Sequence, residues 1–377
     1  MKYVKSLDGL RGLAVILVMF IHAGLAECGW IGVQLFFVLS GYLITSILML
    51  EKNEEAGFFF KRFYWRRSLR IFPVYFAYIF GAAVIWKLTG APADLPNKFP
   101  WLASYTFNIA KTFGWVTSSQ FFTHFWSLAI EEQFYLVWPF LVYFLPRWTL
   151  KKLALSIILL APVARYVFGA WMLGNGASPA KTALAIYFFT PTQLDALMFG
   201  ALIPIFDLDK RVKNPLQAFA GGFALFALAG LTNLLLALPH ATRNDLGYIP
   251  MSLWNLQHVW SYTVVNFFAL TLVLFLIGNQ AHWVRTFFSN PILTQIGKVS
   301  YGVYIFHWAI MVGFEKWIGA VTWLTFWPYL GIVFALSKVS YCVVEKPFIA
   351  LKDRWLTKPA AMRVPLGAEQ TWEKEQG

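Results

Sequence analysis

Arg11 and His22 lie on the first apolar segment at a spacing that suits chemistry inside a helix bundle. Their separation of eleven residues corresponds to three helical turns plus about 20°, so both side chains share one face, about 16 Å apart along the axis. An imidazole can act as a general base or as a nucleophile. An ionisable side chain within an apolar helix is a functional candidate by default. Arg11 alone would be interpreted as an anchor at a membrane edge, and its alignment with His22 favours a shared site.

A second basic element precedes the third apolar stretch. Arg67 and Arg70 in WRRSLRIFPVYF are three residues apart and share a helical face. Planar guanidinium groups suit phosphate recognition. The alternative is that both side chains extend to lipid headgroups. The combination with Arg11 predicts an anionic ligand whose reactive end reaches His22.

The segment HFWSLAIEEQFYLVWP at 124–139 contributes carboxylates at the start of another apolar run. Glu131 and Glu132 point about 100° apart, so we expect at most one of them to face a given site. A carboxylate beside His22 would fix the tautomer of the imidazole, and Glu131 is the candidate. Three further residues of this segment are candidates for substrate contact or support, namely Trp126, Ser127 and Tyr135.

Other polar residues fall at similar depth in the remaining apolar segments. Arg165 and Asp195 predict a buried ion pair, which either supports the site or only fixes helix packing. Ser300, Tyr304 and His307 share one helical face. This face either contacts substrate or is a polar stripe that packs against neighbouring helices. No cluster has the spacing of a metal site, and we expect no disulfide between Cys28 and Cys342.

The composition predicts a polytopic all-α membrane protein. Of 377 residues, 59% are hydrophobic and only 13% are charged, and the mean hydropathy is +0.59. Soluble domains carry about 25% charged residues, so a soluble enzyme, a disordered chain and a fibrous repeat are excluded. Aromatic residues make up 19% of the chain, which suits anchoring at both lipid interfaces.

Hydropathy predicts about ten transmembrane helices in one bundle with a polar intramembrane cavity. The expected spans are 10–27, 29–50, 71–90, 128–145, 153–173, 187–206, 215–238, 259–278, 299–318 and 323–344. The stretch 91–127 is ambiguous. With this topology 23 of the 31 Lys and Arg residues lie on one side and six on the other, which places both termini in the cytoplasm. We therefore attribute the net charge of +13 to basic loops that contact anionic lipid on the cytoplasmic side, and we expect no nucleic-acid partner.

Two boundaries follow from the same pattern. Residues 1–345 form the expected membrane domain, and residues 346–377 form a polar cytoplasmic tail that we expect to fray. The first apolar segment is interpreted as a retained helix and not as a cleaved signal peptide, because Asp8 precedes it, His22 lies inside it and no cleavage motif follows.

Several motifs, in order, resemble one known family. LDGLRGLAVILVMFIHAG, GWIGVQLFFVLSGYLIT, RRSLRIFPVYF, FWSLAIEEQFYLVWP, SYGVYIFHW and SYCVVEKP are similar to the motifs of the membrane acyltransferase-3 family over residues 5–350. That family comprises integral-membrane O-acyltransferases of bacterial O-antigen, exopolysaccharide and Nod factors, with macrolide acylases as relatives. Gln34 departs from the pattern, because many members carry Asp at this position.

The resemblance implies transfer of an acyl group, commonly acetyl, from cytoplasmic acyl-CoA to a hydroxyl, usually of a carbohydrate or lipid-linked glycan. By the family's motifs, Arg11 and His22 form its arginine–histidine pair, and Arg67 and Arg70 would hold the phosphates of CoA. Some members append an extracytoplasmic serine-hydrolase-like domain; without one, we expect the membrane domain to meet its acceptor directly. A bacterial inner-membrane location is implied.

Four questions remain open at this point. His22 could act directly as a base on the acceptor or be acylated first. The acceptor could be a small molecule such as a macrolide. A proton-coupled transporter or a non-catalytic scaffold would use the same polar layer. The oligomeric state and the length of the acyl chain are not specified by the sequence.

Overall fold

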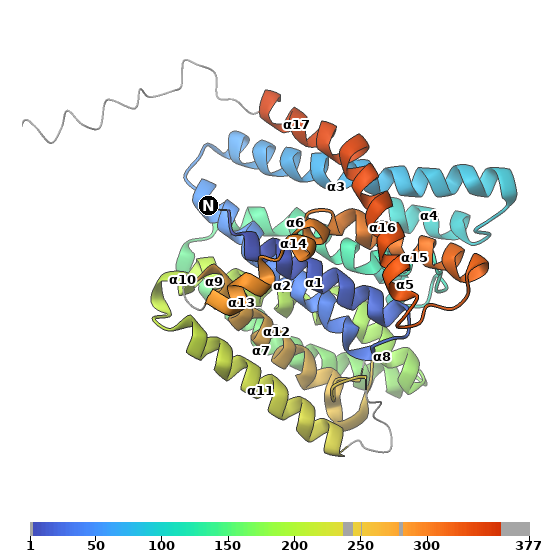
Figure 1. Ribbon diagram of the computed structural model, residues 1–377. Coiled ribbons are helices and arrows are strands. Elements are labelled where there is room, and N and C mark those ends of the chain that lie inside the picture. Colours follow the sequence, from blue (N-terminus) through green and yellow to red (C-terminus); the bar gives the residue numbers. More distant parts are fainter. Residues whose placement is uncertain (1–2, 237–243, 250, 279–281, 356–377) are drawn as a thin grey trace, which may run out of the picture.

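The helices of this protein are arranged around a central pair, α1 and α2 (Figure 1). The computed structural model describes residues 3–236, 244–249, 251–278 and 282–355. Within these ranges the regular structure is helical throughout, without β-strands. Alongside the central pair, α3 and α17 run on one side of the molecule and α11 on the opposite side (Figure 1). The expectation of an all-α fold is confirmed.

The helices have the following bounds: α1 Lys5–His22, η1 Glu27–Trp30, α2 Ile31–Glu51, α3 Ala56–Thr89, α4 Leu95–Ala103, α5 Phe107–Thr112, α6 Phe125–Phe144, α7 Arg147–Gly174, α8 Pro179–Phe188, η2 Thr190–Thr192, α9 Leu194–Phe206, α10 Leu208–Arg211, α11 Pro215–Leu236, η3 Trp254–Leu256, α12 Gln257–Ile277, α13 His282–Phe288, α14 Pro291–Lys298, α15 Ser300–Trp317, α16 Phe326–Ser340, the π-helical segment η4 Tyr341–Glu345 and α17 Lys346–Trp355.

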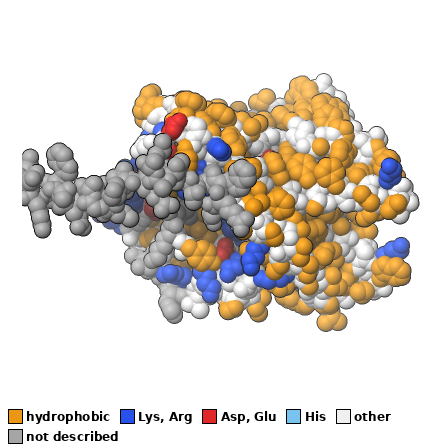
Figure 2. All heavy atoms as spheres, turned by 90° about the horizontal axis from the view of Figure 1, so that it is seen from above, with side chains coloured by type: hydrophobic (Ala, Val, Ile, Leu, Met, Phe, Trp, Pro, Cys, Tyr) orange, Lys and Arg blue, Asp and Glu red, His pale blue; other side chains and the backbone are white. Residues whose placement is uncertain are grey.

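Six helical segments among the described residues are long and apolar enough to cross a membrane. They comprise residues 27–51, 56–89, 147–174, 215–236, 254–277 and 326–351. Large apolar side chains such as Leu159, Leu228 and Trp327 point outward on these helices, and hydrophobic side chains cover most of the face in Figure 2. An apolar exterior of this extent requires lipid as its solvent, so the protein is a multi-pass membrane protein. The length and composition of the helices do not confirm the predicted count of ten spans, which stays a prediction.

Two predicted segments differ from the structure. The expected span 187–206 is broken, because α8, the short turn η2 and α9 replace one continuous helix. Pro191 lies in this break, and a proline lacks the amide hydrogen that a continuing helix needs. The basic segment 51–70, expected as a loop before the third span, is mostly helical and belongs to the 34-residue α3.

The ambiguous stretch 91–127 contains α4 and α5, which are too short to cross a membrane. These helices are tied to the bundle by buried hydrogen bonds. The Tyr75 hydroxyl donates to the Leu102 carbonyl at 2.8 Å, and the Asn108 amide donates to the Phe188 carbonyl at 3.1 Å. The stretch therefore serves as a packed connection between α3 and α6.

Glycines permit the central helices to approach closely. A Cβ built on Gly41 of α2 would lie 1.9 Å from the Leu197 carbonyl oxygen of α9, and one on Gly200 of α9 would lie 1.9 Å from the Val38 carbonyl oxygen of α2. Small residues at facing positions are the usual means by which membrane helices pack, since lipid provides little hydrophobic drive between them. This contact fixes the position of α2.

The C-terminal part of the chain continues as helix beyond Glu345. The segments α16, η4 and α17 follow one another directly, and α17 lies against α3. The first residues of the predicted tail are thus helical and not frayed. Residues 356–377 lie outside the described residues.

Candidate active site

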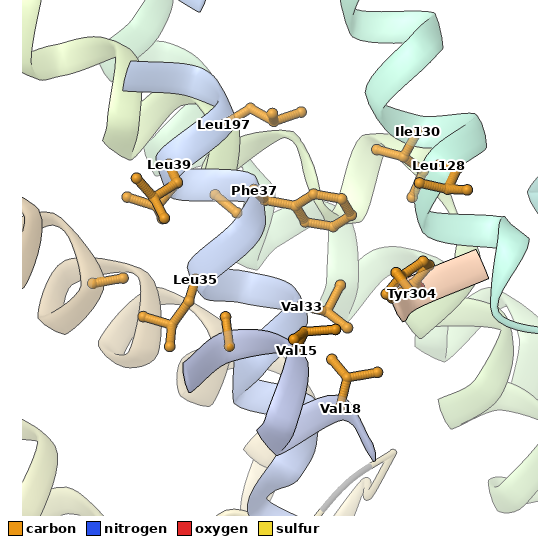
Figure 3. Packing of buried hydrophobic residues seen from close by; sticks show 14 of the residues in the cluster. Val15, Val18, Val33, Leu35, Phe37, Leu39, Leu128, Ile130, Leu197 and Tyr304 are labelled. Atoms are coloured by element: carbon orange, nitrogen blue, oxygen red, sulfur yellow. The ribbon is translucent and has the colours of Figure 1, made fainter. Parts of the chain in front are cut away.

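One face of α2 lines two cavities along almost its whole length. The cavity-lining residues of α2 include Val33, Phe37, Ser40, Ile44, Ile47 and Glu51. Their alternating spacings of four and three residues place them on a single helical face. Val33 and Glu51 are about 27 Å apart along the axis at 1.5 Å per residue. Figure 3 shows Val33 and Phe37 pointing toward Leu128 of α6 and Tyr304 of α15.

This space consists of two adjoining cavities. The outer cavity has a volume of ≈ 590 Å³, and the inner cavity has a volume of ≈ 120 Å³. Arg11, Arg67 and Arg70 line both of them, as do Ser300 and Tyr301. The three predicted phosphate-binding arginines are therefore brought together where the two cavities meet. We call the end of the bundle that carries them the arginine end.

The arginines differ in the partners they already have. Arg62 and Arg66 are 3.4 and 3.2 Å from the Glu51 carboxylate, and Arg11 is 3.3 Å from Asp8. Among the described residues, Arg67 and Arg70 form no salt bridge. The Arg67 guanidinium stacks over the Tyr135 ring, 5.6 Å from its centroid. Two cations that are not held in a salt bridge at a cavity suit an anionic ligand.

Two carboxylates line the inner cavity beside these cations. Glu131 and Glu132 both contribute to its wall, so the expectation that only one of them could face the site is wrong. The cavity extends around the first turns of α6 and thus meets side chains that point about 100° apart. Tyr135, one turn beyond Glu131, is hydrogen-bonded to Ser40 of α2.

A hydrogen-bonded group closes the deep end of the inner cavity. The Tyr304 hydroxyl donates to the His124 carbonyl oxygen at 2.7 Å and lies 2.5 Å from the Ser127 hydroxyl. Since the hydrogen of Tyr304 is used on the carbonyl, Ser127 is the donor in the second bond. Trp126 lies behind this group and packs against Tyr187, with ring centroids 4.5 Å apart.

Three histidines meet one helical turn beyond Tyr304. His22 ends α1, His307 lies on α15, and His124 precedes α6. The Nδ1 atom of His22 is 2.7 Å from Nε2 of His307, with the two rings stacked at a centroid distance of 4.9 Å. The ring of His124 lies 4.9 Å from that of His307 and 6.5 Å from that of His22. The structure therefore joins the predicted His22 and His307 and adds His124.

The hydrogen-bond network assigns the tautomers of the first two rings. His307 Nδ1 is 2.7 Å from the Tyr304 carbonyl oxygen, which can only accept, so this nitrogen carries the hydrogen. His307 Nε2 then accepts from Nδ1 of His22. His22 is left with a free lone pair on Nε2, the state that a general base or nucleophile requires.

The predicted partner of His22 is corrected by this arrangement. Glu131 was expected to orient the imidazole, but the bond to Nδ1 comes from His307, while Glu131 lines the cavity with the arginines. Glu131 is seven residues beyond His124, which directly precedes α6 and belongs to the histidine cluster. At 1.5 Å per residue this puts the carboxylate about 10 Å closer to the arginine end.

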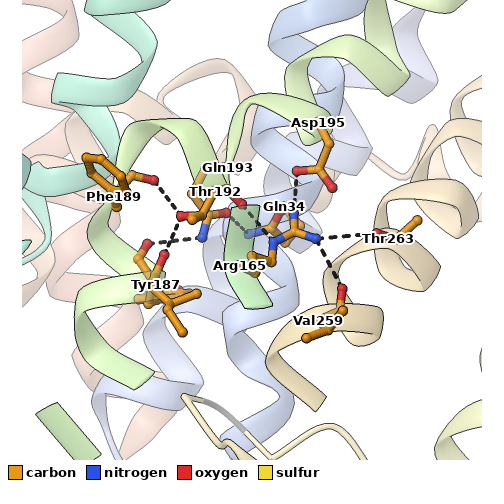
Figure 4. A network of polar contacts seen from close by, with 10 residues as sticks. Gln34, Arg165, Tyr187, Phe189, Thr192, Gln193, Asp195, Val259 and Thr263 are labelled. Atoms are coloured by element: carbon orange, nitrogen blue, oxygen red, sulfur yellow. Dashed lines mark hydrogen bonds and ion pairs between the residues drawn. The ribbon is translucent and has the colours of Figure 1, made fainter. Parts of the chain in front are cut away.

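Arg165 and Asp195 form a separate buried network (Figure 4). Their Nη2 and Oδ1 atoms are 2.5 Å apart, and both side chains are fully buried. Arg165 also donates from Nε to the Thr192 carbonyl at 2.9 Å, which holds the break between α8 and α9. Neither residue lines the two cavities described above. Gln34, the residue that departs from the family pattern, donates to Gln193 at 2.9 Å beside this network.

Sequence reasoning missed Ser40, His124 and Trp308. Ser40 lies in an apolar helix without a recognisable pattern. His124 was quoted within its motif but precedes the predicted span 128–145, so nothing indicated that it was buried. Trp308 follows His307 directly, and its ring centroid is 4.1 Å from that of His22.

Comparison with known proteins gives the same assignment as the motifs. A family model described as an acyltransferase domain matches residues 4–342. A Staphylococcus aureus (strain COL) protein named provisionally as an O-acetyltransferase is 27% identical over 92% of this chain and 58% of its own length. The peptidoglycan O-acetyltransferase of Listeria monocytogenes is 28% identical over 95% of this chain and 60% of its own length. The chain thus spans somewhat more than half of these relatives, and no solved structure matches it. Because the family model covers nearly the whole chain, the protein belongs to the acyltransferase-3 family of acyltransferase domains.

Proposed function

We propose that this protein is an integral-membrane O-acetyltransferase that moves an acetyl group from acetyl-CoA to a carbohydrate hydroxyl. In this proposal the arginine end faces the cytoplasm of a bacterial cell, both termini lie on that side, and the membrane is the inner one. The single observation that carries the proposal is the lined face of α2, which leads from Arg67 and Arg70 to Tyr304. Among the described residues no histidine lines either cavity, and the histidine cluster begins one helical turn beyond Tyr304, at His307.

The outer cavity suits the nucleotide end of the donor. Arg67 and Arg70 bind its phosphates, with Arg11 as a third cation at the junction. The narrower inner cavity accepts the extended pantetheine arm and directs the thioester toward Tyr304. The apolar residues Val33, Phe36 and Leu43 in its wall suit the uncharged arm better than the phosphates.

His22 performs the proton transfer. Its free Nε2 accepts the proton of the acceptor hydroxyl, the oxygen attacks the thioester carbon, and the C–S bond breaks. The proton then passes from His22 to the departing CoA sulfur, so that an ester and CoA thiol are formed. His307 and Tyr304 keep the ring of His22 in the tautomer that this step needs.

A carbohydrate acceptor is supported by the relative named as a peptidoglycan O-acetyltransferase. Sugar hydroxyls reach the histidine cluster from the end opposite to the arginines, where His22 and Trp308 are partly exposed. Peptidoglycan fragments are therefore the first acceptors to test.

The test is acetyl transfer by the purified protein in detergent. Radiolabelled acetyl-CoA is incubated with the protein, with and without soluble peptidoglycan fragments, and the label is followed to sugar, protein or water. We expect label on the sugar for the wild-type protein and none for His22→Ala. Arg62→Ala serves as control, because Arg62 pairs with Glu51 and lines neither cavity. Equal transfer by His22→Ala would contradict the proposal.

A further inference from the structure

Two buried polar atoms beside His22 have no hydrogen-bond partner among the described residues. They are Nε1 of Trp308, which is a donor, and Nδ1 of His124. His124 Nε2 is 3.2 Å from the Ile305 carbonyl oxygen and carries the hydrogen of that bond, so Nδ1 of this ring is an acceptor. One donor and one acceptor thus stay unused next to the proposed base.

An indole N–H without a partner is unusual in a membrane protein. Leaving a buried donor unsatisfied is unfavourable, and lipid offers no water to compensate. Buried tryptophans normally find an acceptor for this group. An exception at the site of chemistry therefore indicates a group that arrives with the substrate.

The Trp308 indole packs against two histidine rings without a hydrogen bond to either. The indole is tilted by 33° relative to the His22 ring and by 29° relative to the His124 ring, at centroid distances of 4.1 and 5.7 Å. The N–H bond lies in the plane of the indole. The indole thus lies against His22, while its N–H group stays without a hydrogen bond among the described residues.

We infer that Trp308 is a catalytic residue, whose Nε1–H donates a hydrogen bond to the acyl carbonyl oxygen during transfer. This inference rests on the proposed function. When the acceptor oxygen attacks, the C=O electron pair moves to the carbonyl oxygen, which becomes an oxyanion. Trp308 stabilises that charge until the C–S bond breaks and the C=O bond forms again. The proton of the acceptor hydroxyl meanwhile resides on His22 Nε2 and is passed to the sulfur.

A carbonyl oxygen fits this donor better than the acceptor hydroxyl does. The hydroxyl gives its hydrogen to His22, whereas the acyl carbonyl oxygen has only lone pairs and requires a donor. Negative charge on it exists only in the transition state and the tetrahedral intermediate, and a fixed donor in a site that excludes water has its largest effect on such charge.

Trp308→Phe tests the inference, because phenylalanine keeps an aromatic ring against His22 and removes only the N–H group and the second ring. We expect kcat for acetyl transfer to fall by about 10²–10³-fold, the effect typical of one lost oxyanion donor. The KM values for acetyl-CoA and acceptor should stay within about twofold, because the bond forms only in the transition state. Trp317→Phe, in the last turn of the same helix and 81% exposed, is the matched control and should retain wild-type kinetics.

Three results would overturn the inference. Unchanged kcat in Trp308→Phe would show that the N–H is not used, and a rise confined to the KM of the acceptor would place the donor on the hydroxyl in the ground state. If Trp308→Phe does not fold, β-(3-benzothienyl)alanine at position 308 replaces N–H by sulfur with little change of shape, and the same loss of kcat is required. Absence of transfer by the wild-type protein would instead defeat the proposed function, and this inference with it.

Discussion

His22 Nδ1 and His307 Nε2 are joined by a 2.7 Å hydrogen bond, and His307 is held in turn by the carbonyl oxygen of Tyr304. This series of two hydrogen bonds resembles the way in which a carboxylate orients a catalytic histidine, with a backbone carbonyl in place of the acid. Because the Tyr304 carbonyl oxygen is neutral, these hydrogen bonds set the tautomer of His22 without a negative charge next to its ring.

The first prediction concerns His307 as a positioning residue. His307→Ala removes the acceptor for His22 Nδ1, so the hydrogen can move to Nε2 and the base is lost. We expect kcat to fall by about 10²–10⁴-fold, the range seen when such a tautomer is disturbed, with little change in the KM for acetyl-CoA. His307→Gln, whose side-chain oxygen can accept in place of Nε2, should restore part of the activity. Equal loss in both variants would indicate a packing role only.

The second prediction concerns the unpaired arginines. Arg67→Ala and Arg70→Ala each remove a cation from the junction of the two cavities. We expect the KM for acetyl-CoA to rise at least tenfold in each, in line with the about 1.5–3 kcal/mol of a hydrogen bond to a charged group, while kcat changes less. Arg62→Ala, with its partner Glu51, should leave the KM unchanged. A fall of kcat without any change of KM would contradict phosphate binding.

The third prediction concerns the Arg165–Asp195 pair. Because both side chains are fully buried, Asp195→Ala leaves an unpaired charge and should destabilise the protein by about 3–5 kcal/mol. The double variant Arg165→Met with Asp195→Leu removes both charges and should be more stable than the single one. Thermal unfolding in detergent measures the stability of the single and the double variant. Equal stability of the single and double variants would show that the charges are not coupled.

The fourth prediction concerns the contact between α2 and α9. Gly41→Ala places a methyl group 1.9 Å from the Leu197 carbonyl oxygen, so the helices must separate. Overpacking of this kind costs about 1–3 kcal/mol, and we expect a lower Tm together with a lower kcat, because α2 lines the cavities. Gly81→Ala on α3 is the matched control, since a Cβ there meets nothing within 4 Å. If both variants behave alike, the close contact does not position the site.

The fifth prediction concerns pH and the turn after α9. The Asp207 carboxylate lies 2.5 Å from the Arg147 guanidinium, and this hydrogen bond lowers the pKa of Asp207 below its usual range. A carboxyl with a lowered pKa stabilises the folded state above its unfolded pKa and loses this effect as the pH falls through its folded pKa. We expect Asp207→Asn to lower the Tm slightly at pH 7 and to lose this effect only at a pH below the lowered pKa of the folded state.

The turn also supplies a control for this measurement. Arg147 donates to the carbonyl oxygens of Pro204 and Ile205 at 2.8 and 2.9 Å, which does not depend on the charge of Asp207. Arg147→Ala should therefore lower the Tm at both pH values. A pH-independent effect of Asp207→Asn would refute the role assigned to its charge.

The sequence predicted the helices, and the residues that share a helical face, where a pattern repeats along one helix. The helical spacing of Arg11 and His22 predicted a shared face of one helix, α1, which contains both residues, and the apolar runs located the helices. Contacts between different helices were harder to predict from the sequence. The pairing of His22 with His307 joins residues 285 positions apart. Glu131, which was expected beside the His22 ring, lines the inner cavity instead. The burial of His124 depends on how α6 begins, which hydropathy does not determine.

Tyr304 both closes the inner cavity with its side chain and holds His307 with its backbone. A rotation of α15 that widened the passage would also move His307, which lies on the same helix, away from Nδ1 of His22. The thioester must pass Tyr304 to reach His22, so the passage has to open by side-chain movement alone if the base is to keep its tautomer. A movement of the whole helix that admitted water would disable the base at the same time and spare the thioester from wasteful hydrolysis.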